Sequence, residues 1–348
     1  MYRLVPSPTA RARLGAVAIA ALACLAPPAH AGKTLDGIKS RGQLACGVST
    51  GVIGFAAADS QGHWRGLDVD VCRAIAAAVL GDANKVRWVP LSAQQRFTAL
   101  QSGEVDILSR NTTWSLTRDA ALGLHFAGVT YYDGQGFMVA KKSKVSSAKQ
   151  LKNAEICVQS GTTTEKNMAD YFRAQGIKVK PVVFDKFEPS IKAFFSGRCQ
   201  AYTTDASALA FIRAKEAPNA DDYTVLPEII SKEPLAPAVR RGDDEWFAIV
   251  KWTVNALIEA EELGITQARV DGLKSSPDPA IQRFLGVGED LGKSLGLDRE
   301  WAARAVKAVG NYGEIFNRNV GADSPLKLPR GLNALWNKGG ILYAQPLR

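Results

Sequence analysis

The strongest constraint on the fold is an order of strands and helices that occurs twice along the chain. Ranges 44–48, 68–80, 86–90, 92–103 and 105–108 predict strand, helix, strand, helix and strand. The same order returns at 155–159, 162–176, 179–184, a helix ending at 197, and 199–203. This alternation is typical of a parallel sheet. Because the segment at Ala99 aligns with that at Ala193 but shares few identities, we infer a shared topology.

The two units place polar side chains beyond the ends of corresponding strands. Asn111 corresponds to Asp205 at the same spacing. Open α/β sheets bind ligands at the carboxyl ends of their strands, so two facing units predict a cleft between two lobes. We expect residues 32–138 and 236–348 to form lobe 1 with a C-terminal extension, and 139–235 to form lobe 2. The crossings are expected near 136–141 and 235–240, and 325–348 is expected as an irregular tail on lobe 1.

The first 31 residues predict a cleaved signal peptide. Three arginines precede the apolar run 14–26, and an Ala-x-Ala site follows, so we expect cleavage after Ala31. One alternative is an uncleaved membrane span, for which the apolar run is too short. The other is a lipoprotein cleaved before Cys24, but the residues before Cys24 match a lipoprotein cleavage site poorly. Cleavage leaves 40 basic and 34 acidic residues, without the basic and aromatic interleaving of a nucleic-acid groove. The protein is therefore expected in the periplasm, with no nucleic-acid partner.

Four cysteines remain after cleavage, an even number in an oxidising compartment. They allow three pairings, and free thiols are a further alternative. We favour Cys46 with Cys72 and Cys157 with Cys199, since each pair then stays within one predicted unit. The absence of a Cys-x-x-Cys motif and the presence of only His63 and His125 after the signal argue against a metal site.

One motif resembles a known family. The sequence Gly66-Leu67-Asp68-Val69-Asp70-Val71 is similar to the signature of the family 3 extracellular solute-binding proteins, the polar amino-acid receptors of ABC transporters. Segments 109–118, 160–165, 203–205 and 237–240 also resemble that family, and the cysteines and long C-terminal extension resemble its general L-amino-acid receptors. The resemblance implies an α/β, two-lobed type II periplasmic binding protein fold with two hinge strands. The signature itself is interpreted as structural, because its acidic residues suit the first turn of a helix. A calcium loop is excluded, because the rest of its twelve-residue pattern is missing.

An amino acid needs a site for its carboxylate and another for its ammonium. Arg118 and the N–H groups around Gly161, Thr162 and Thr163, at a predicted helix start that Thr162 is expected to cap, suit the carboxylate, and Asp205 suits the ammonium. The resemblance implies the same roles and adds Thr113 beside the ammonium. The alternatives are a surface pair of Arg118 with Asp119, and a helix cap for Asp205.

Four further residues are candidates for the pocket that holds the ligand side chain. They are Asn111, Arg110, Phe55 and Trp114, although aromatic residues at such spacing are more often core residues. Arg110 would add a second cation for an acidic side chain, and we expect broad recognition of polar and acidic amino acids and their amides.

No common catalytic motif occurs, and the only histidines after the signal are His63 and His125. We therefore expect a receptor without enzymatic activity or cofactor. It would be a monomer that captures an L-amino acid and delivers it to a membrane permease by hinge closure. The alternatives are a periplasmic lyase or dehydratase of the same fold, and a ligand sensor for a membrane signalling partner.

Overall fold

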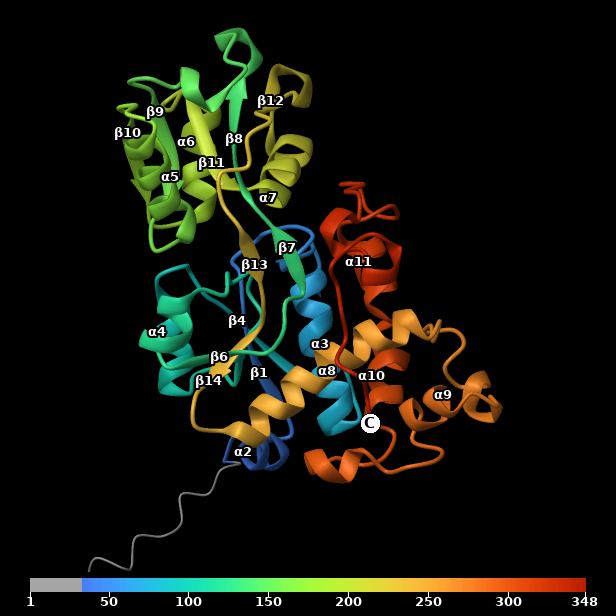
Figure 1. Cartoon of the computed structure of the whole chain (residues 1–348). Coiled ribbons are helices and arrows are strands. Elements are labelled where there is room, and N and C mark those ends of the chain that lie inside the picture. Colours follow the sequence, from blue (N-terminus) through green and yellow to red (C-terminus); the bar gives the residue numbers. More distant parts are fainter. Residues whose placement is uncertain (1–32) are drawn as a thin grey trace, which may run out of the picture.

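The computed structural model describes residues 33–348, which form two lobes joined by a pair of strands (Figure 1). The predicted signal peptide and its cleavage site lie outside the described residues. Each lobe contains one five-stranded sheet with helices packed on it, and both sheets have a buried apolar core. No helix within 33–348 is long and apolar enough to cross a membrane.

Lobe 1 is built on a sheet with strand order β4-β1-β5-β14-β6. The strands are β1 Leu44–Val48, β4 Val86–Pro90, β5 Ile107–Leu108, β6 Leu124–Phe126 and β14 Ala238–Arg240. Its helices are α2 Lys33–Arg41, α3 Leu67–Leu80, α4 Gln95–Ser102 and α8 Asp244–Glu262, and a small hairpin consists of β2 Ala57–Ala58 and β3 Trp64–Arg65. β1 pairs in parallel with β4 and β5, and β14 is antiparallel to its neighbours.

Lobe 2 repeats this topology with strand order β10-β9-β11-β8-β12. The strands are β8 Gln135–Ala140, β9 Glu155–Gln159, β10 Lys180–Phe184, β11 Ala201–Asp205 and β12 Tyr223–Val225, and the helices are α5 Thr163–Ala174, α6 Phe187–Phe195 and α7 Ala206–Phe211. Three strands are parallel, and β8 is antiparallel to β11 and β12. The repeated topology inferred from the sequence is confirmed.

The lobes are connected by β7 Tyr131–Asp133 and β13 Glu233–Leu235, which pair antiparallel (Figure 1). The first crossing comes earlier than the expected 136–141. The buried run of β8 looks like a connecting strand in sequence, but it pairs with β11 and belongs to the lobe 2 sheet. Of the second expected segment, only Leu235 lies in the hinge, and β14 already belongs to lobe 1.

The C-terminal extension covers α3 of lobe 1 (Figure 1). It contains α9 Pro279–Phe284, α10 Trp301–Val309 and α11 Tyr312–Asn319. Arg304 donates to the carbonyls of Ala77 and Ala78 at the end of α3, and Arg318 pairs with Asp70 at its beginning, with 2.8 Å between Nη2 and Oδ2. The tail beyond residue 325 has no α-helix or paired strand, and its Asn333 side chain bonds both the N–H and the carbonyl of Tyr132 in β7.

The favoured cysteine pairing is confirmed. A disulfide between Cys46 and Cys72 joins β1 to α3, and one between Cys157 and Cys199 joins β9 to the segment before β11. Each bond therefore fixes a strand to a neighbouring element within its own lobe.

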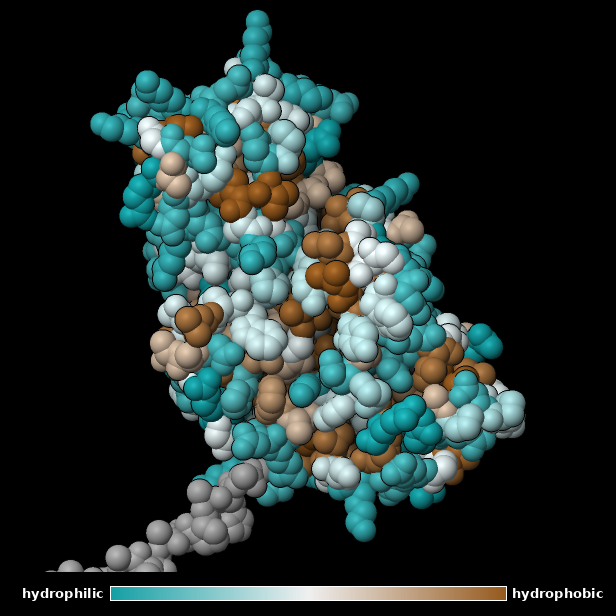
Figure 2. Space-filling model, in the orientation of Figure 1, coloured by the Kyte–Doolittle hydropathy of each residue, from teal (hydrophilic) through white to brown (hydrophobic). Residues whose placement is uncertain are grey.

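The surface is mostly hydrophilic on the face shown in Figure 2. Apolar side chains gather near the middle of this face, around the boundary between the hinge region and the C-terminal extension. Leu332 of the tail and Ile229 before β13 are among the large apolar residues that are more than half exposed.

Candidate functional site

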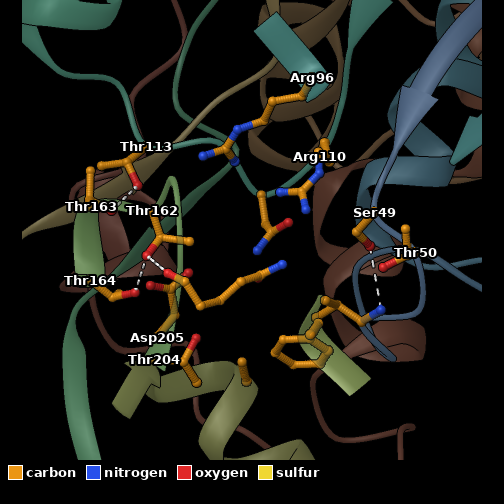
Figure 3. A pocket seen from close by; sticks show the side chains of 15 residues that line it. Ser49, Thr50, Arg96, Arg110, Thr113, Thr162, Thr163, Thr164, Thr204 and Asp205 are labelled. Atoms are coloured by element: carbon orange, nitrogen blue, oxygen red, sulfur yellow. Dashed lines mark hydrogen bonds between the residues drawn. The ribbon is translucent and has the colours of Figure 1, made fainter. Parts of the chain in front are cut away.

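A cavity lies between the lobes, with polar residues on both sides (Figure 3). Lobe 1 contributes Ser49, Thr50, Val52, Arg96, Arg110, Asn111 and Thr113. Lobe 2 contributes Gln159, Thr162, Thr163, Thr164, Phe187, Thr204, Asp205 and Ala208. The lobes also touch here, since Gln94 donates to Ser160 at 2.9 Å. Because both lobes line one cavity, a bound molecule would contact both at once.

The lobe 1 side is shaped by the Gly-x-Asp signature. Asp68 at the start of α3 accepts from the N–H of Asn111 at 2.7 Å and from the Ser109 hydroxyl at 3.3 Å, and it fixes the loop after β5. Asn111 has a left-handed φ of 34° there. A Cβ on Gly66 would lie 2.0 Å from the carbonyl oxygen of Phe55, so this position requires glycine. Burial raises the pKa of Asp68 to about 7, although its hydrogen bonds oppose the shift.

Two arginines give the lobe 1 wall its positive charge. Burial lowers the pKa of Arg96 well below its usual value, and the charges of Arg110 and Arg118 lower it further. Burial lowers the pKa of Arg110 to about 10, and its Nε donates to the Leu91 carbonyl at 2.9 Å. Within residues 33–348 the buried Nε of Arg96 has no hydrogen-bond partner. This wall therefore retains donor capacity for an anionic group.

Arg118 lies directly behind this wall, on a short π-helical turn at Thr117–Ala121. Its guanidinium donates to the Thr113 carbonyl at 2.9 Å and lies 5.2 Å from the centre of the Phe97 ring. Burial lowers its pKa, and the charges of Glu233 and Asp205 oppose that shift. Arg118 is only 7% exposed, and Asp119 pairs with Arg241 instead, so the surface-pair alternative is wrong. Arg118 does not itself line the cavity.

The lobe 2 wall contains the first turn of α5. The Thr162 hydroxyl accepts from the N–H of Glu165 at 3.1 Å and caps the helix, as its sequence predicts. Gly161, with a φ of 70°, donates its N–H to Glu165 at 3.0 Å, so that donor is already used. The remaining first-turn N–H groups have no acceptor inside the helix, and the helix dipole favours an anion near them.

Asp205 stands at the end of β11 and faces the same cavity (Figure 3). It occupies the N-cap position of α7, but its side chain caps nothing, so the capping alternative is wrong. Burial raises its pKa well above the ordinary value, Asp133 and Glu233 raise it further, and Arg118 and Arg96 oppose the shift. No hydrogen-bond donor of the described chain contacts its carboxylate. An added cationic group would stabilise this buried acid.

The two aromatic residues suggested as pocket walls lie elsewhere. Phe55 is 2% exposed and packs edge-on against Tyr131 at 5.1 Å in the lobe 1 core. Trp114 stacks on Phe126 at 5.7 Å and borders a different cavity, near the C-terminal tail. Neither ring lines the interlobe cavity.

Sequence reasoning missed several residues of the site. The cavity-lining ones that no prediction named as site residues are Ser49, Thr50, Val52, Arg96, Gln159, Thr164, Phe187, Thr204 and Ala208. Of these, Thr164 and Thr204 lie in the segments 160–165 and 203–205 that the sequence analysis had singled out. Arg96 carried a signal, because it shares the buried face of α4 with Ala99 and Leu100, where a charged residue needs a partner or a role. Glu233 of β13 was also missed, and its carboxylate bonds to both lobes.

Chemically, the cavity offers cations on one wall and a buried acid with a helix N-terminus on the other. Within the described part of the chain, no three His, Cys, Asp or Glu side chains form a group suited to a metal ion. The arrangement suits a small molecule that carries both a negative and a positive charge.

A sequence profile of the bacterial extracellular solute-binding proteins, family 3, matches residues 44–269. The chain belongs to this family. Its relatives include the general L-amino acid-binding periplasmic protein AapJ of Rhizobium johnstonii, which is 57% identical over 96% of this chain and 98% of that protein. The glutamate/glutamine/aspartate/asparagine-binding protein BztA of Rhodobacter capsulatus is 54% identical over 94% and 97%.

A solved structure of a similar solute-binding protein supports the same fold. The ABC transporter periplasmic binding protein from Brucella ovis, with glutathione bound, superposes with a TM-score of 0.88 at 56% identity and covers 90% of this chain and 99% of its own. This solute-binding protein therefore has the type II periplasmic binding protein fold, and its relatives are binding proteins rather than enzymes.

Proposed function

We propose that this solute-binding protein captures L-amino acids in the interlobe cavity, with broad recognition of acidic side chains and their amides. The observation that carries the proposal is the opposition of charge across the cavity, with Arg96 and Arg110 from lobe 1 and Asp205 from lobe 2. An amino acid carries both an anionic carboxylate and a cationic ammonium, so it can interact favourably with both kinds of charge in the cavity. A molecule that lacks either charge would leave one wall without a partner, which costs free energy in a buried site.

In this proposal the backbone of the ligand is held by residues of both lobes. Arg118 and the α5 first turn at Thr162 and Thr163 hold the α-carboxylate, with Gly161 shaping that turn. Asp205 and Thr113 hold the α-ammonium. The guanidinium of Arg118 would reach the ligand by leaving the Thr113 carbonyl, which is the one acceptor that it contacts in the described chain.

The side chain of the ligand would lie beside Asn111 and Arg110. Asn111 brings a buried Oδ1 that has no hydrogen-bond partner within residues 33–348, and Arg110 brings a cation, so the pair suits an amide or a carboxylate. The relatives described as binding general L-amino acids and glutamate, glutamine, aspartate and asparagine support this range. Glutathione, bound by the Brucella ovis protein, ends in a γ-glutamyl group with a free α-amino and α-carboxylate.

The proposal extends to the cellular role. The protein would be exported, cleaved after Ala31, and act as a periplasmic monomer that closes on its ligand and presents it to the permease of an ABC transporter. Closure follows if the ligand binds the closed form more tightly than the open form, and charged groups from both lobes supply that difference.

Calorimetry of the refolded, ligand-stripped mature protein against the twenty L-amino acids tests the proposal. We expect tight binding of several polar and acidic amino acids with no consumption of the ligand. Turnover of a ligand would favour the lyase or dehydratase alternative. Failure of every amino acid to bind would refute the proposal.

A further inference from the structure

Glu233 is a buried carboxylate on the hinge strand that bonds to both lobes. It is 1% exposed. Its Oε2 accepts from the hydroxyls of Thr113 in lobe 1 at 2.5 Å and Thr163 in lobe 2 at 2.8 Å. Its Oε1 accepts from the Asn167 amide and the Ser231 hydroxyl, both at 2.7 Å. One side chain therefore connects the hinge to each wall of the cavity.

These bonds determine where the hydroxyl protons lie. A carboxylate only accepts hydrogen bonds, whereas a hydroxyl has one proton to donate and two lone pairs. Thr113 and Thr163 both bond Oε2, so each directs its single proton to Glu233. Their oxygens lie 3.3 Å apart, and both residues line the cavity (Figure 3). The two hydroxyls therefore present only acceptor lone pairs to the cavity.

Two hydroxyls oriented in this way cannot donate hydrogen bonds to a ligand carboxylate. An anion needs donors, and neither hydroxyl has a proton left for it. An ammonium group instead supplies donors only, and the two hydroxyls together with the Asp205 carboxylate offer it three acceptor groups. Asp133, the register partner of Glu233, does not compete for the hydroxyls, because its carboxylate bonds Ser207 and the N–H of Gly134.

We propose that Glu233 is a positioning residue that orients the Thr113 and Thr163 hydroxyls as acceptors, so that the site selects ligands with an α-ammonium group. The proposal rests on the proposed amino-acid binding. It assigns the side chain of Thr163 to the ammonium and leaves only its backbone N–H to the carboxylate. Selection for the charged amine then depends on a residue that need not touch the ligand.

The test compares L-glutamate with glutarate, which has the same carbon chain and carboxylates but no amine. In the wild type we expect glutarate to bind at least 100-fold more weakly. In Glu233→Gln, the amide donates to the hydroxyls, which become free to donate toward the ligand. L-glutamate should then bind about 10- to 100-fold more weakly, and the preference over glutarate should fall at least tenfold.

The matched control is Glu228→Gln, in the same segment. The Glu228 carboxylate accepts from the Ser147 hydroxyl and the N–H of Ala148, both in lobe 2. This variant should keep both affinities within about twofold. Equal weakening of both ligands in Glu233→Gln would show a purely structural role and overturn the proposal, as would unchanged affinities.

A second pair of variants covers the case in which Glu233→Gln does not fold. Thr163→Val removes the hydroxyl, whereas Thr163→Ser keeps it. The preference for L-glutamate over glutarate should fall in the valine variant and persist in the serine variant; equal preferences in both would contradict the inference. If the wild type binds no amino acid, the proposed function fails first, which distinguishes the two failures.

Discussion

The two lobes share one topology but bring different charges and supports to the cavity. Lobe 1 presents Arg96 and Arg110 with Arg118 behind them, and a C-terminal extension covers its outer helix α3. Lobe 2 presents Asp205 and the start of α5, and its edge strand β10 is largely exposed. The repeated sheet therefore supplies the two strand ends, whereas the loops determine which charge each end carries.

Removal of one charged side chain from either lobe should weaken amino-acid binding more than any other change. Asp205→Asn and Arg118→Ala should each weaken amino-acid binding about 100- to 1000-fold, because removal of one member of a buried charge arrangement leaves the other uncompensated. Calorimetry measures the loss, and circular dichroism checks the fold. The exposed lobe 2 acid Asp222 gives the control Asp222→Asn, which should bind normally. Retained micromolar affinity in either test variant would remove that residue from the site.

A second prediction concerns the disulfide of each lobe, because only the disulfide-linked helix of lobe 1 is also held by the C-terminal extension. In the chain-entropy estimate, the 26-residue and 42-residue separations of the disulfides correspond to about 3.5 and about 4 kcal/mol. Arg304 and Arg318 still hold α3 when Cys46 and Cys72 are replaced by serine. Replacing Cys157 and Cys199 should therefore lower the free energy of unfolding more, as measured by denaturant titration. A larger loss in the lobe 1 variant would reverse this comparison.

A third prediction concerns the side chains that fix the cavity-lining loop of each lobe. Asp68 holds the loop of lobe 1, whereas in lobe 2 the neutral amide of Gln135 bonds the Thr164 carbonyl at 2.9 Å. The pKa of Asp68 is about 7 in the folded protein against 3.8 ordinarily, so the folded state binds more protons between these values. Its contribution therefore lowers the free energy of unfolding as pH rises from about 4 to 7, by at most about 4 kcal/mol.

The variant Asp68→Asn should flatten this pH dependence. Asp133 and Asp205 contribute slopes of the same sign, because burial raises their pKa values too, so the difference between wild-type and variant curves isolates Asp68. Denaturant unfolding at several pH values gives both curves. Parallel curves would show that Asp68 does not titrate in this range.

The smallest effects are expected at two residues of lobe 1, one of which lines the interlobe cavity while the other lies outside it. Asn111→Gly should weaken amide and acidic ligands about tenfold, because it removes one hydrogen-bonding side chain while accommodating the φ of 34°. Trp114→Ala should change affinity less than twofold, since Trp114 borders a different cavity. Isothermal titration calorimetry measures the affinity of both variants. A larger effect of Trp114→Ala would show that the ring contributes to the ligand site.

Sequence reasoning succeeded where the signal was local. The strand Leu44–Val48 and the cap at Thr162 depend on neighbouring residues and occur where predicted. It failed where pairing over long distances decides the outcome: β8 looks like a crossing strand until β11 pairs with it. Glu233 was invisible for the same reason, because its partner Thr113 lies 120 residues away. Arg96 was detectable in principle, as a charge on an otherwise apolar helix face.

The contact between Asp70 and Arg318 joins the part of the chain that matches the family to the C-terminal extension that follows it. The family match ends at residue 269, yet Asp70 of the signature bonds a residue of α11, and Ala74, Ala77 and Ala78 of α3 are almost fully buried in the intact chain. A chain cut at 269 would leave Asp70 with only the longer contact to Arg73, at 3.7 Å, and would expose an apolar helix face to water. The end of the family match is therefore not a boundary of cooperative unfolding, and residues 270–348 should melt together with lobe 1 rather than as a separate module.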